Sequence, residues 1–320
     1  MNRTILFLAT LLFCISCFAQ ENNPKRPPIL GIGSVTIRLT ERAGFDFYST
    51  TLGLQATTTA CIAGCWSHLP VSSHQRLELR YGKGLLKQSE GDNLQKPVAL
   101  PNPQTAESNN LLQVTFETSD VEALHRYLES RGLHPGEIFS VDPNGDNPQF
   151  FVQDPEGHDI GFIRFKGTEG YQPAHAVSDH VIHAGFVVHD RGAEDKFYKD
   201  ILGFRVYWHG GMKEGEDNWV DMQVPDGTDW LEYMLKVPDN ATHKQLGVMN
   251  HIALGVPDIH AAERQLINNG WKGTEEPKIG RDGKWQLNLY DPDETRVELM
   301  EFKPTKEPCC SPYTGPHPGP

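Results

Sequence analysis

The sequence predicts an α+β protein made of four similar units, each a β-strand, an α-helix and three further strands, which pair into two domains. Internal repeats are the first observation, because similarity at a constant offset indicates a structural unit that is used more than once. The second is that the repeats combine strands, a helix ending near Gly, and a hairpin with an Asp-Pro turn. The matching segments are 33–55 with 183–205, 111–133 with 249–271, and 150–165 with 287–302.

The N-terminal residues are typical of an export signal. Arg3 precedes the apolar run Ile5–Phe18, which is too short for a comfortable membrane span, and Ala19 ends that run before a polar segment. We therefore expect a signal peptide over residues 1–19 and an exported protein, either periplasmic or secreted. An alternative is a lipoprotein signal in which Cys17 carries the lipid and anchors the chain to a membrane.

Two domains are expected after this signal, over residues 28–166 and 179–303, because the repeats fall within these ranges. A polar, Pro-bearing stretch over 82–110 predicts a long loop inside the first domain, and residues 166–179 predict a linker. Residues 304–320 are rich in Pro and Gly and predict a disordered tail.

The helix of the last unit carries the clearest periodicity. Over residues 258–270 the spacing predicts one apolar face formed by Ile259, Ala262, Leu266 and Ile267, followed by Gly270 as the stop. Such a face packs a helix against a sheet.

Composition limits the partners. The formal net charge is −13 and the chain has no basic block, so we expect neither nucleic acid nor an anionic membrane surface as partner, and a small molecule as substrate. Four units are enough for a complete cup in one chain, which leaves a monomer and a homodimer open. Cys61 and Cys65 could form a small disulfide in an exported chain or remain two free thiols.

Four polar residues stand on predicted strands of the second domain: His183, Glu232, His251 and Glu298. Alternation along the strand at His251 puts the imidazole on the face of small residues, while larger apolar residues point the other way. One face can therefore pack against helices while the other lines a cup. The counterparts given by the repeat offsets are Gly33 for His183, Glu78 for Glu232, Gln113 for His251 and Gly161 for Glu298.

Three of these four counterparts lack the ionisable or metal-binding side chain, although the surrounding strands and helices are repeated. A residue required by the fold would be expected in both domains, whereas a chemical role needs to appear in only one. Two imidazoles and two carboxylates form a mixed N/O ligand set that suits Ni, Co, Zn, Mn or Fe(II). We therefore predict one divalent ion bound by His183, Glu232, His251 and Glu298.

A divalent ion on vicinal oxygens of a substrate acidifies the adjacent C–H and stabilises the charge that develops. A carboxylate beside it can carry the proton, and Glu298 and Glu232 are the candidates for this catalytic role.

Segments 183–204, 249–271 and 289–302 resemble the vicinal oxygen chelate superfamily, which contains glyoxalase I, bleomycin-resistance proteins and extradiol dioxygenases. The resemblance implies βαβββ modules paired into a cup with one metal inside, and the family's metal positions map onto the same four residues. This His/Glu/His/Glu set is most similar to glyoxalase I. It implies lyase or isomerase chemistry in which Glu298 or Glu232 is the base.

Two alternatives follow from the same resemblance. Extradiol ring-cleaving dioxygenases also have four modules with an empty first domain, and they use two His and one Glu on Fe(II) or Mn(II). In that case His183, His251 and Glu298 would be the ligands. The second alternative is a non-catalytic, resistance-type protein that binds a small molecule.

Overall fold

The structure is a computed structural model that describes residues 24–61, 65–81, 110–140, 144–167 and 174–320. The predicted signal peptide, nearly all of the predicted loop over 82–110 and the middle of the predicted linker lie outside these residues, so export and the lipid anchor stay predictions. In the described part of the chain, every helix is too short or too polar to cross a bilayer.

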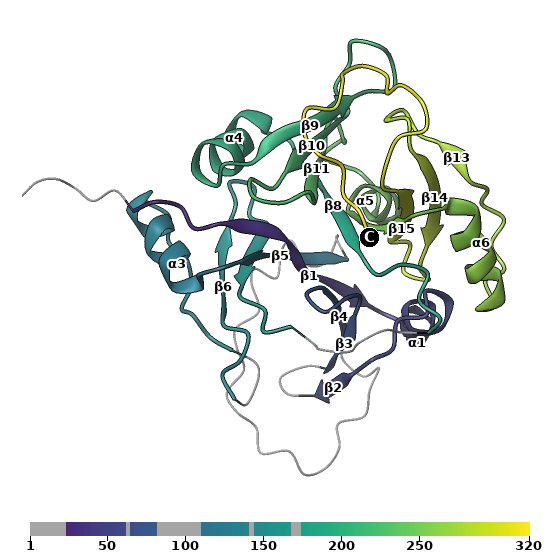
Figure 1. Ribbon diagram of the computed structural model, residues 1–320, viewed down its shortest axis with the longest axis horizontal. Coiled ribbons are helices and arrows are strands. Elements are labelled where there is room, and N and C mark those ends of the chain that lie inside the picture. Colours follow the sequence, from purple (N-terminus) through teal and green to yellow (C-terminus); the bar gives the residue numbers. More distant parts are fainter. Residues whose placement is uncertain (1–23, 62–64, 82–109, 141–143, 168–173) are drawn as a thin grey trace, which may run out of the picture.

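Two curled sheets form the molecule, one from each half of the chain (Figure 1). In the first sheet the described strands run in the order β2 (Thr58–Cys61), β3 (Cys65–Pro70), β4 (Arg76–Tyr81), β1 (Ile29–Leu39), β5 (Leu111–Thr118), β7 (Asp159–Ile163) and β6 (Gln149–Gln153). In the second the order is β13 (Lys278–Ile279), β14 (Trp285–Tyr290), β15 (Arg296–Glu301), β12 (His251–Val256), β8 (Val181–Val187), β11 (Trp230–Met234), β10 (Trp219–Gln223) and β9 (Arg205–Gly210).

Both sheets have the same topology, which confirms the predicted α+β class and the pairing of modules. In each, the two first strands of the modules pair antiparallel, β1 with β5 and β8 with β12, and each of them pairs parallel with the last strand of its own module. The second module of the first half differs in one respect. Where the second sheet has β13, it has a single bridge between Phe139 and Gln149.

Each module carries a helix after its first strand. They are α1 (Arg42–Asp46) continued by the π-helical turn η1 (Phe47–Thr51), α3 (Val121–Ser130), α4 (Arg191–Asp195) continued by η2 (Lys196–Ile201), and α6 (Ile259–Asn268), with the extra helix α5 (His243–Met249) before β12. Asp residues cap α3, α4 and α6 by accepting a backbone N–H of the first turn. On α6 the predicted face is buried except for Ile267, which is 56% exposed, because the buried stripe is narrower than we expected.

The two halves share one apolar core and meet through two repeated contacts. Tyr48 of the first half donates its hydroxyl to Asp291 of the second at 2.9 Å, and Tyr198 of the second donates to Asp154 of the first at 3.1 Å. The repeated Phe-Tyr and Asp-Pro motifs are therefore among the residues by which each half holds the other.

Residues 304–320 differ from the predicted disordered tail. The segment lies between the open edge strand β9 and the loop before β14, where the N–H of Thr314 donates to the carbonyl of Tyr207 at 3.0 Å and that of Cys309 to the carbonyl of Arg281 at 2.8 Å. The prediction of disorder was wrong because the two edges of the curled sheet offer unpaired backbone groups that composition does not reveal. Cys309 and Cys310 form a disulfide within this segment. The side chains of Cys61 and Cys65 are not among those that the structure describes, so the small disulfide between them stays a prediction.

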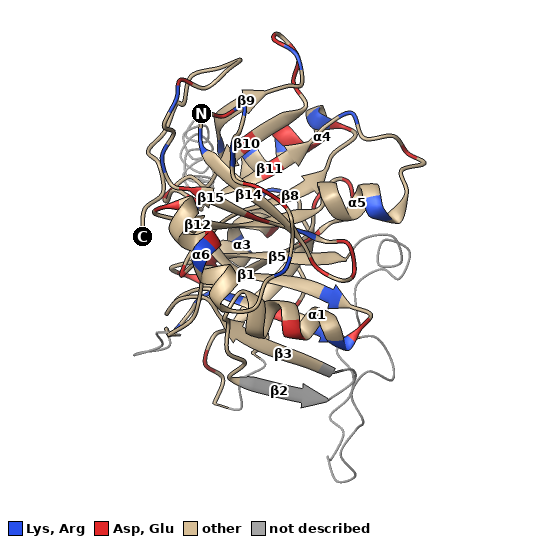
Figure 2. Ribbon diagram, turned by 90° about the vertical axis from the view of Figure 1, so that its right-hand side faces the viewer, with Lys and Arg blue, Asp and Glu red and all other residues tan. Residues whose placement is uncertain are grey.

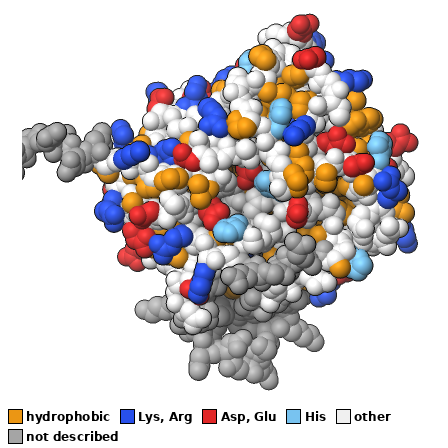
Figure 3. Space-filling model, in the orientation of Figure 1, with side chains coloured by type: hydrophobic (Ala, Val, Ile, Leu, Met, Phe, Trp, Pro, Cys, Tyr) orange, Lys and Arg blue, Asp and Glu red, His pale blue; other side chains and the backbone are white. Residues whose placement is uncertain are grey.

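Charged groups are interspersed over both halves, as the turned view in Figure 2 shows. On the face shown in Figure 3 the hydrophobic side chains lie in small groups between polar and charged ones. The large hydrophobic side chains that are exposed in the described residues are few: Leu30, Ile138, Met212, Ile267 and Tyr290. Most apolar side chains are therefore buried in the cores rather than gathered on an open face.

Candidate metal centre

The four predicted ligand residues lie on the four adjacent central strands of the second sheet. His183 is on β8, Glu232 on β11, His251 begins β12 and Glu298 is on β15. The strand register places Gly185 opposite both Glu232 and His251. A side chain on Gly185 would overlap the ring of His251, since its Cβ would lie 2.2 Å from Cε1. This glycine therefore makes the room in which the imidazole turns toward its partners.

The donor atoms of these residues converge. The two Nε2 atoms of His183 and His251 are 3.0 Å apart. Oε2 of Glu232 lies 3.6 and 3.1 Å from them, and Oε2 of Glu298 lies 3.6 and 3.8 Å from them, in the same order. Donors that each sit about 2.0–2.2 Å from a common ion at ordinary coordination angles are separated by roughly 3.0–3.5 Å. The spacing therefore fits the ligands of a single ion, and His183, His251 and Glu298 alone already satisfy it.

The ring of His251 is held in the orientation that a ligand needs. Its Nδ1 donates to the carbonyl of Met249 at 2.8 Å, which leaves the lone pair on Nε2 for an ion. Arg296 donates to that Nε2 at 2.7 Å. The guanidinium therefore occupies this lone pair in the structure, and an ion that binds to Nε2 would have to replace it. His183 packs its ring against Trp230 with 4.8 Å between the ring centres.

Burial controls the protonation of these groups. It lowers the pKa of His183 and His251 well below the usual range, and the Arg296 guanidinium adds to this. Burial also raises the pKa of Glu232 and Glu298 to about 7, against the opposing effect of Arg296. Neutral imidazoles are ready to bind a metal, while the carboxyl groups have to lose their protons first.

Three further buried charged residues surround this centre, and none of them was predicted from the sequence. Asp221 pairs across the strands with Glu232, and Asp282 and Lys284 precede β14. Lys284 is fully buried, and its Nζ lies 4.4 Å from the centre of the Trp230 ring. Alternation along the strand could have identified Asp221. It places Asp221 on the same face of β10 as Trp219 and Gln223, and the strand pairing puts Asp221 opposite Glu232.

Summing these charges supports a cation. When ionised, Asp221, Glu232, Asp282 and Glu298 carry four negative charges, and Lys284 and Arg296 carry two positive charges, so full ionisation would leave two negative charges uncompensated in a buried region. Burial raises the pKa of all four carboxyl groups, so protons hold this charge when no ion is bound. A divalent ion would bring this sum to zero. Uncompensated buried charge is costly, so the residues present fit a divalent metal ion.

The first sheet places the counterparts and corrects one of them. Its register puts Gln113 at the place of His251 and Gly161 at that of Glu298, as predicted, but puts Ser34 rather than Gly33 at the place of His183. The error arose because the connection between first strand and helix is one residue shorter in the first half. A side chain on Gly161 would collide with Thr115, whose Oγ1 would lie 2.4 Å from its Cβ.

The surviving carboxylate of the first half has other partners. Glu78 forms ion pairs with Arg76 at 2.8 Å and with His68 at 3.6 Å, and these side chains together with Arg80 hold the pKa of Glu78 below its usual range despite burial. In the first half, cationic side chains therefore balance Glu78, whereas its counterpart Glu232 in the second half faces the candidate metal centre.

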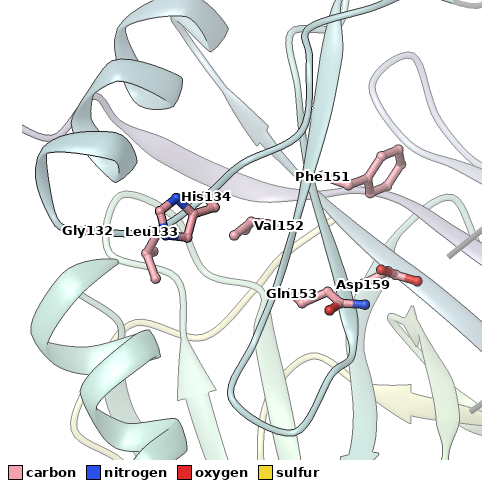
Figure 4. A pocket seen from close by; sticks show the side chains of 7 residues that line it. All are labelled: Gly132, Leu133, His134, Phe151, Val152, Gln153 and Asp159. Carbon is pink, nitrogen blue, oxygen red and sulfur yellow. The ribbon is translucent and has the colours of Figure 1, made fainter. Parts of the chain in front are cut away.

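A hollow of about 410 Å³ lies in the first half, and none of the residues that line it belongs to the metal centre (Figure 4). Its wall includes Leu133 and His134 after α3 and Gln153 and Asp159 of the β6–β7 hairpin. Burial raises the pKa of Asp159 to about 6. This hollow lies at the edge of the first sheet, in which three of the four predicted metal-binding residues have no metal-binding counterpart. We therefore do not place the chemistry there.

Comparison with known proteins identifies the class. Residues 179–299 match the model of the Glyoxalase/Bleomycin resistance protein/Dioxygenase superfamily, and this stretch contains all four converging residues. This part of the chain is therefore similar to the domains of that superfamily.

Individual relatives come from two kinds of protein. The lactoylglutathione lyase of Haemophilus influenzae is 28% identical over 128 residues, which are 39% of this chain and 95% of the relative. Homoprotocatechuate 2,3-dioxygenase from Brevibacterium fuscum, in an anaerobic complex with 3,4-dihydroxyphenylacetate, matches 87% of this chain and 82% of its own with a TM-score of 0.59. A variant of that enzyme with HPCA gives a TM-score of 0.61 over 87% and 72% of the two chains. At 20% identity, both structures show a shared fold.

The shifted carboxyl groups predict how metal uptake depends on pH. The imidazoles are already neutral near pH 7, so an ion displaces protons from Glu232 and Glu298 alone. Affinity for Co²⁺ should rise as pH increases toward about 7, by up to about two decades in Kd per pH unit if both carboxyls release a proton, and level off above it. Calorimetric titration at about pH 6, 7 and 8 measures this. A Kd that is the same at all three values would contradict it.

Proposed function

We propose that the second half of the chain is a metal-dependent active site that chelates vicinal oxygens of a small molecule and performs glyoxalase I-like lyase or isomerase chemistry. The observation that carries this proposal is the convergence of His183, Glu232, His251 and Glu298 within a buried region. The likeness to a lactoylglutathione lyase over 128 residues supports it.

The residues of the chain divide the work between them. His183 and His251 would hold the ion through Nε2, with His251 fixed by its bond to Met249. A divalent ion supplies Lewis acidity to the substrate oxygens. Glu298 or Glu232 takes the proton from the adjacent carbon and returns it, and a pKa near 7 is matched to such a task at neutral pH.

A second candidate is extradiol-type ring cleavage, and a specific observation favours it. His183, His251 and Glu298 alone form a set of two His and one carboxylate with donor atoms within 4.8 Å of one another, which is typical of non-haem Fe(II) oxygenases. The fold shared with the dioxygenase also extends over both halves. In this case Glu232 would not bind the ion permanently.

Metal content and oxygen uptake separate the two candidates. The full-length protein is purified, its metal measured by elemental analysis, and the loaded protein offered a catechol in an oxygen electrode and a hemithioacetal in a spectrophotometric assay. For lyase or isomerase chemistry we expect Ni, Co or Zn and turnover of the hemithioacetal without oxygen uptake. Iron or manganese with oxygen uptake on the catechol would favour ring cleavage. A protein that takes up no divalent ion would contradict both.

A further inference from the structure

The two repeated contacts between the halves are not equivalent in chemistry. In both, the Asp of an Asp-Pro turn accepts two backbone N–H groups through Oδ1 and a Tyr hydroxyl through Oδ2. The contact at Asp154 contains two ionisable side chains that the equivalent contact at Asp291 lacks. Glu194 stands where the other contact has Gly44, and His158 stands where it has Thr295. Since the contact at Asp291 forms without them, the fold does not require this acid and this imidazole.

Glu194 is a buried carboxylate with a free oxygen. Its residue is 0% exposed. Oε1 accepts the backbone N–H of Glu156 at 3.1 Å, while Oε2 has no hydrogen-bond partner in the described part of the chain. A buried carboxylate oxygen without a partner is costly, so this atom points to a group that the described residues do not supply.

Three residues could bind a metal ion at this place. Asp154, His158 and Glu194 each offer an atom of the kind that binds metals, and these atoms lie within 4.8 Å of one another. Nδ1 of His158 forms a hydrogen bond of 2.7 Å with Oδ2 of Asp154, and an ion that binds both atoms would replace this bond and separate them to roughly 3 Å. The residues come from both halves, since Asp154 and His158 border the hairpin turn between β6 and β7 and Glu194 is on α4.

The charge around these atoms is negative. Asp154, Glu156 and Asp190 all act on Glu194, and the combined effect of burial and these acids raises the pKa of Glu194 to about 9. The neighbouring Glu156 is paired with His189 at 3.0 Å, and His158 is the partly exposed member, through which an ion could enter.

We propose that Asp154, His158 and Glu194 form a second divalent-cation site, located between the two halves and separate from the centre at His183 and His251. One nitrogen and two carboxylate donors suit a transition ion such as Zn²⁺, Mn²⁺ or Co²⁺ rather than a hard, all-oxygen site. Binding requires the proton shared by His158 and Asp154 and any proton on Glu194 to leave to solvent. The ion then holds the hairpin turn of one half to the helix of the other.

Co²⁺ stoichiometry tests the site. Full-length protein is loaded with Co²⁺, freed of excess by gel filtration and analysed for metal per chain. We expect two ions in the wild type, one in His158→Thr, one in His251→Ala and none in the combined variant. His158→Thr introduces the residue that the equivalent turn already carries, so we expect it to fold. Glu194→Gln, which keeps the acceptor for Glu156, decides the question if that variant does not.

The outcomes separate this site from the proposed active site. Thr295→Ala in the equivalent contact is the matched control and should keep two ions. One ion in the wild type and none in His251→Ala would overturn the second site and leave the proposed function intact. One ion that is lost in His158→Thr but kept in His251→Ala would support the second site and remove the basis of the proposed function.

Discussion

Replacing His251 with Ala is expected to release the metal ion from the second half and to abolish turnover. His251 supplies one of four donors, and apparent binding energies of roughly 10–16 kcal/mol for four-ligand zinc sites correspond to about 3 kcal/mol per ligand. Affinity for Co²⁺ should therefore fall by at least about a hundredfold. The substitution also leaves Arg296 without the nitrogen to which it donates. Titration of the purified variant with Co²⁺ measures the loss.

The matched control for this experiment is Gln113→Ala. Gln113 occupies the same place in the first sheet, is also buried and bonds to Thr36 at 3.3 Å. It should cost some stability without changing Co²⁺ affinity at the centre. A His251→Ala protein that folds and keeps wild-type affinity would remove His251 from the ligand set.

Replacing Glu298 with Gln is expected to lower the rate of proton transfer by about 10²–10⁴-fold, the usual contribution of a positioned acid or base. Gln keeps the size of the side chain and an oxygen that can face the ion, but it cannot take up a proton. Glu232→Gln tests the other candidate base. Exchange of the substrate's C–H hydrogen with solvent deuterium, followed by NMR in the metal-loaded variants, reports the step directly.

The comparison of the two variants identifies the base. The carboxylate whose loss stops exchange while metal content stays high is the base, and the other is a ligand only. Glu294→Gln, at a partly exposed residue before β15 that pairs with Lys244, is a control that should leave exchange unchanged. If all three variants exchange at the wild-type rate, neither carboxylate acts as the base.

The modules and the convergence of the four predicted ligand residues were predictable because they depend on local patterns. Alternation along a strand determines the face of the sheet on which His251 lies. Comparison of the two repeated domains shows which side chains are absent from the first domain although its fold is the same. The four residues converge as expected because each stands on the first or last strand of its module, and these strands are neighbours in one sheet.

The counter-charges of the centre were not predictable in this way. The register between β10 and β11 places Asp221 opposite Glu232. Lys284 reaches Trp230 from a loop, where the sequence has no helical or strand periodicity that could predict the contact. The one-residue shift from Gly33 to Ser34 has a similar cause, because strand pairing and not sequence offset decides which residues face each other.

The sequence alone therefore determined the four modules, their helices, and the two imidazoles and two carboxylates that the second half adds to the fold. The tertiary structure alone decided three things: the charge balance of the centre, the ordering of residues 304–320, and the meeting of Asp154, His158 and Glu194 between the halves. The physical reason is that periodicity encodes the face on which a side chain lies. The partner across that face comes from a distant segment, and only the packed chain brings the two together.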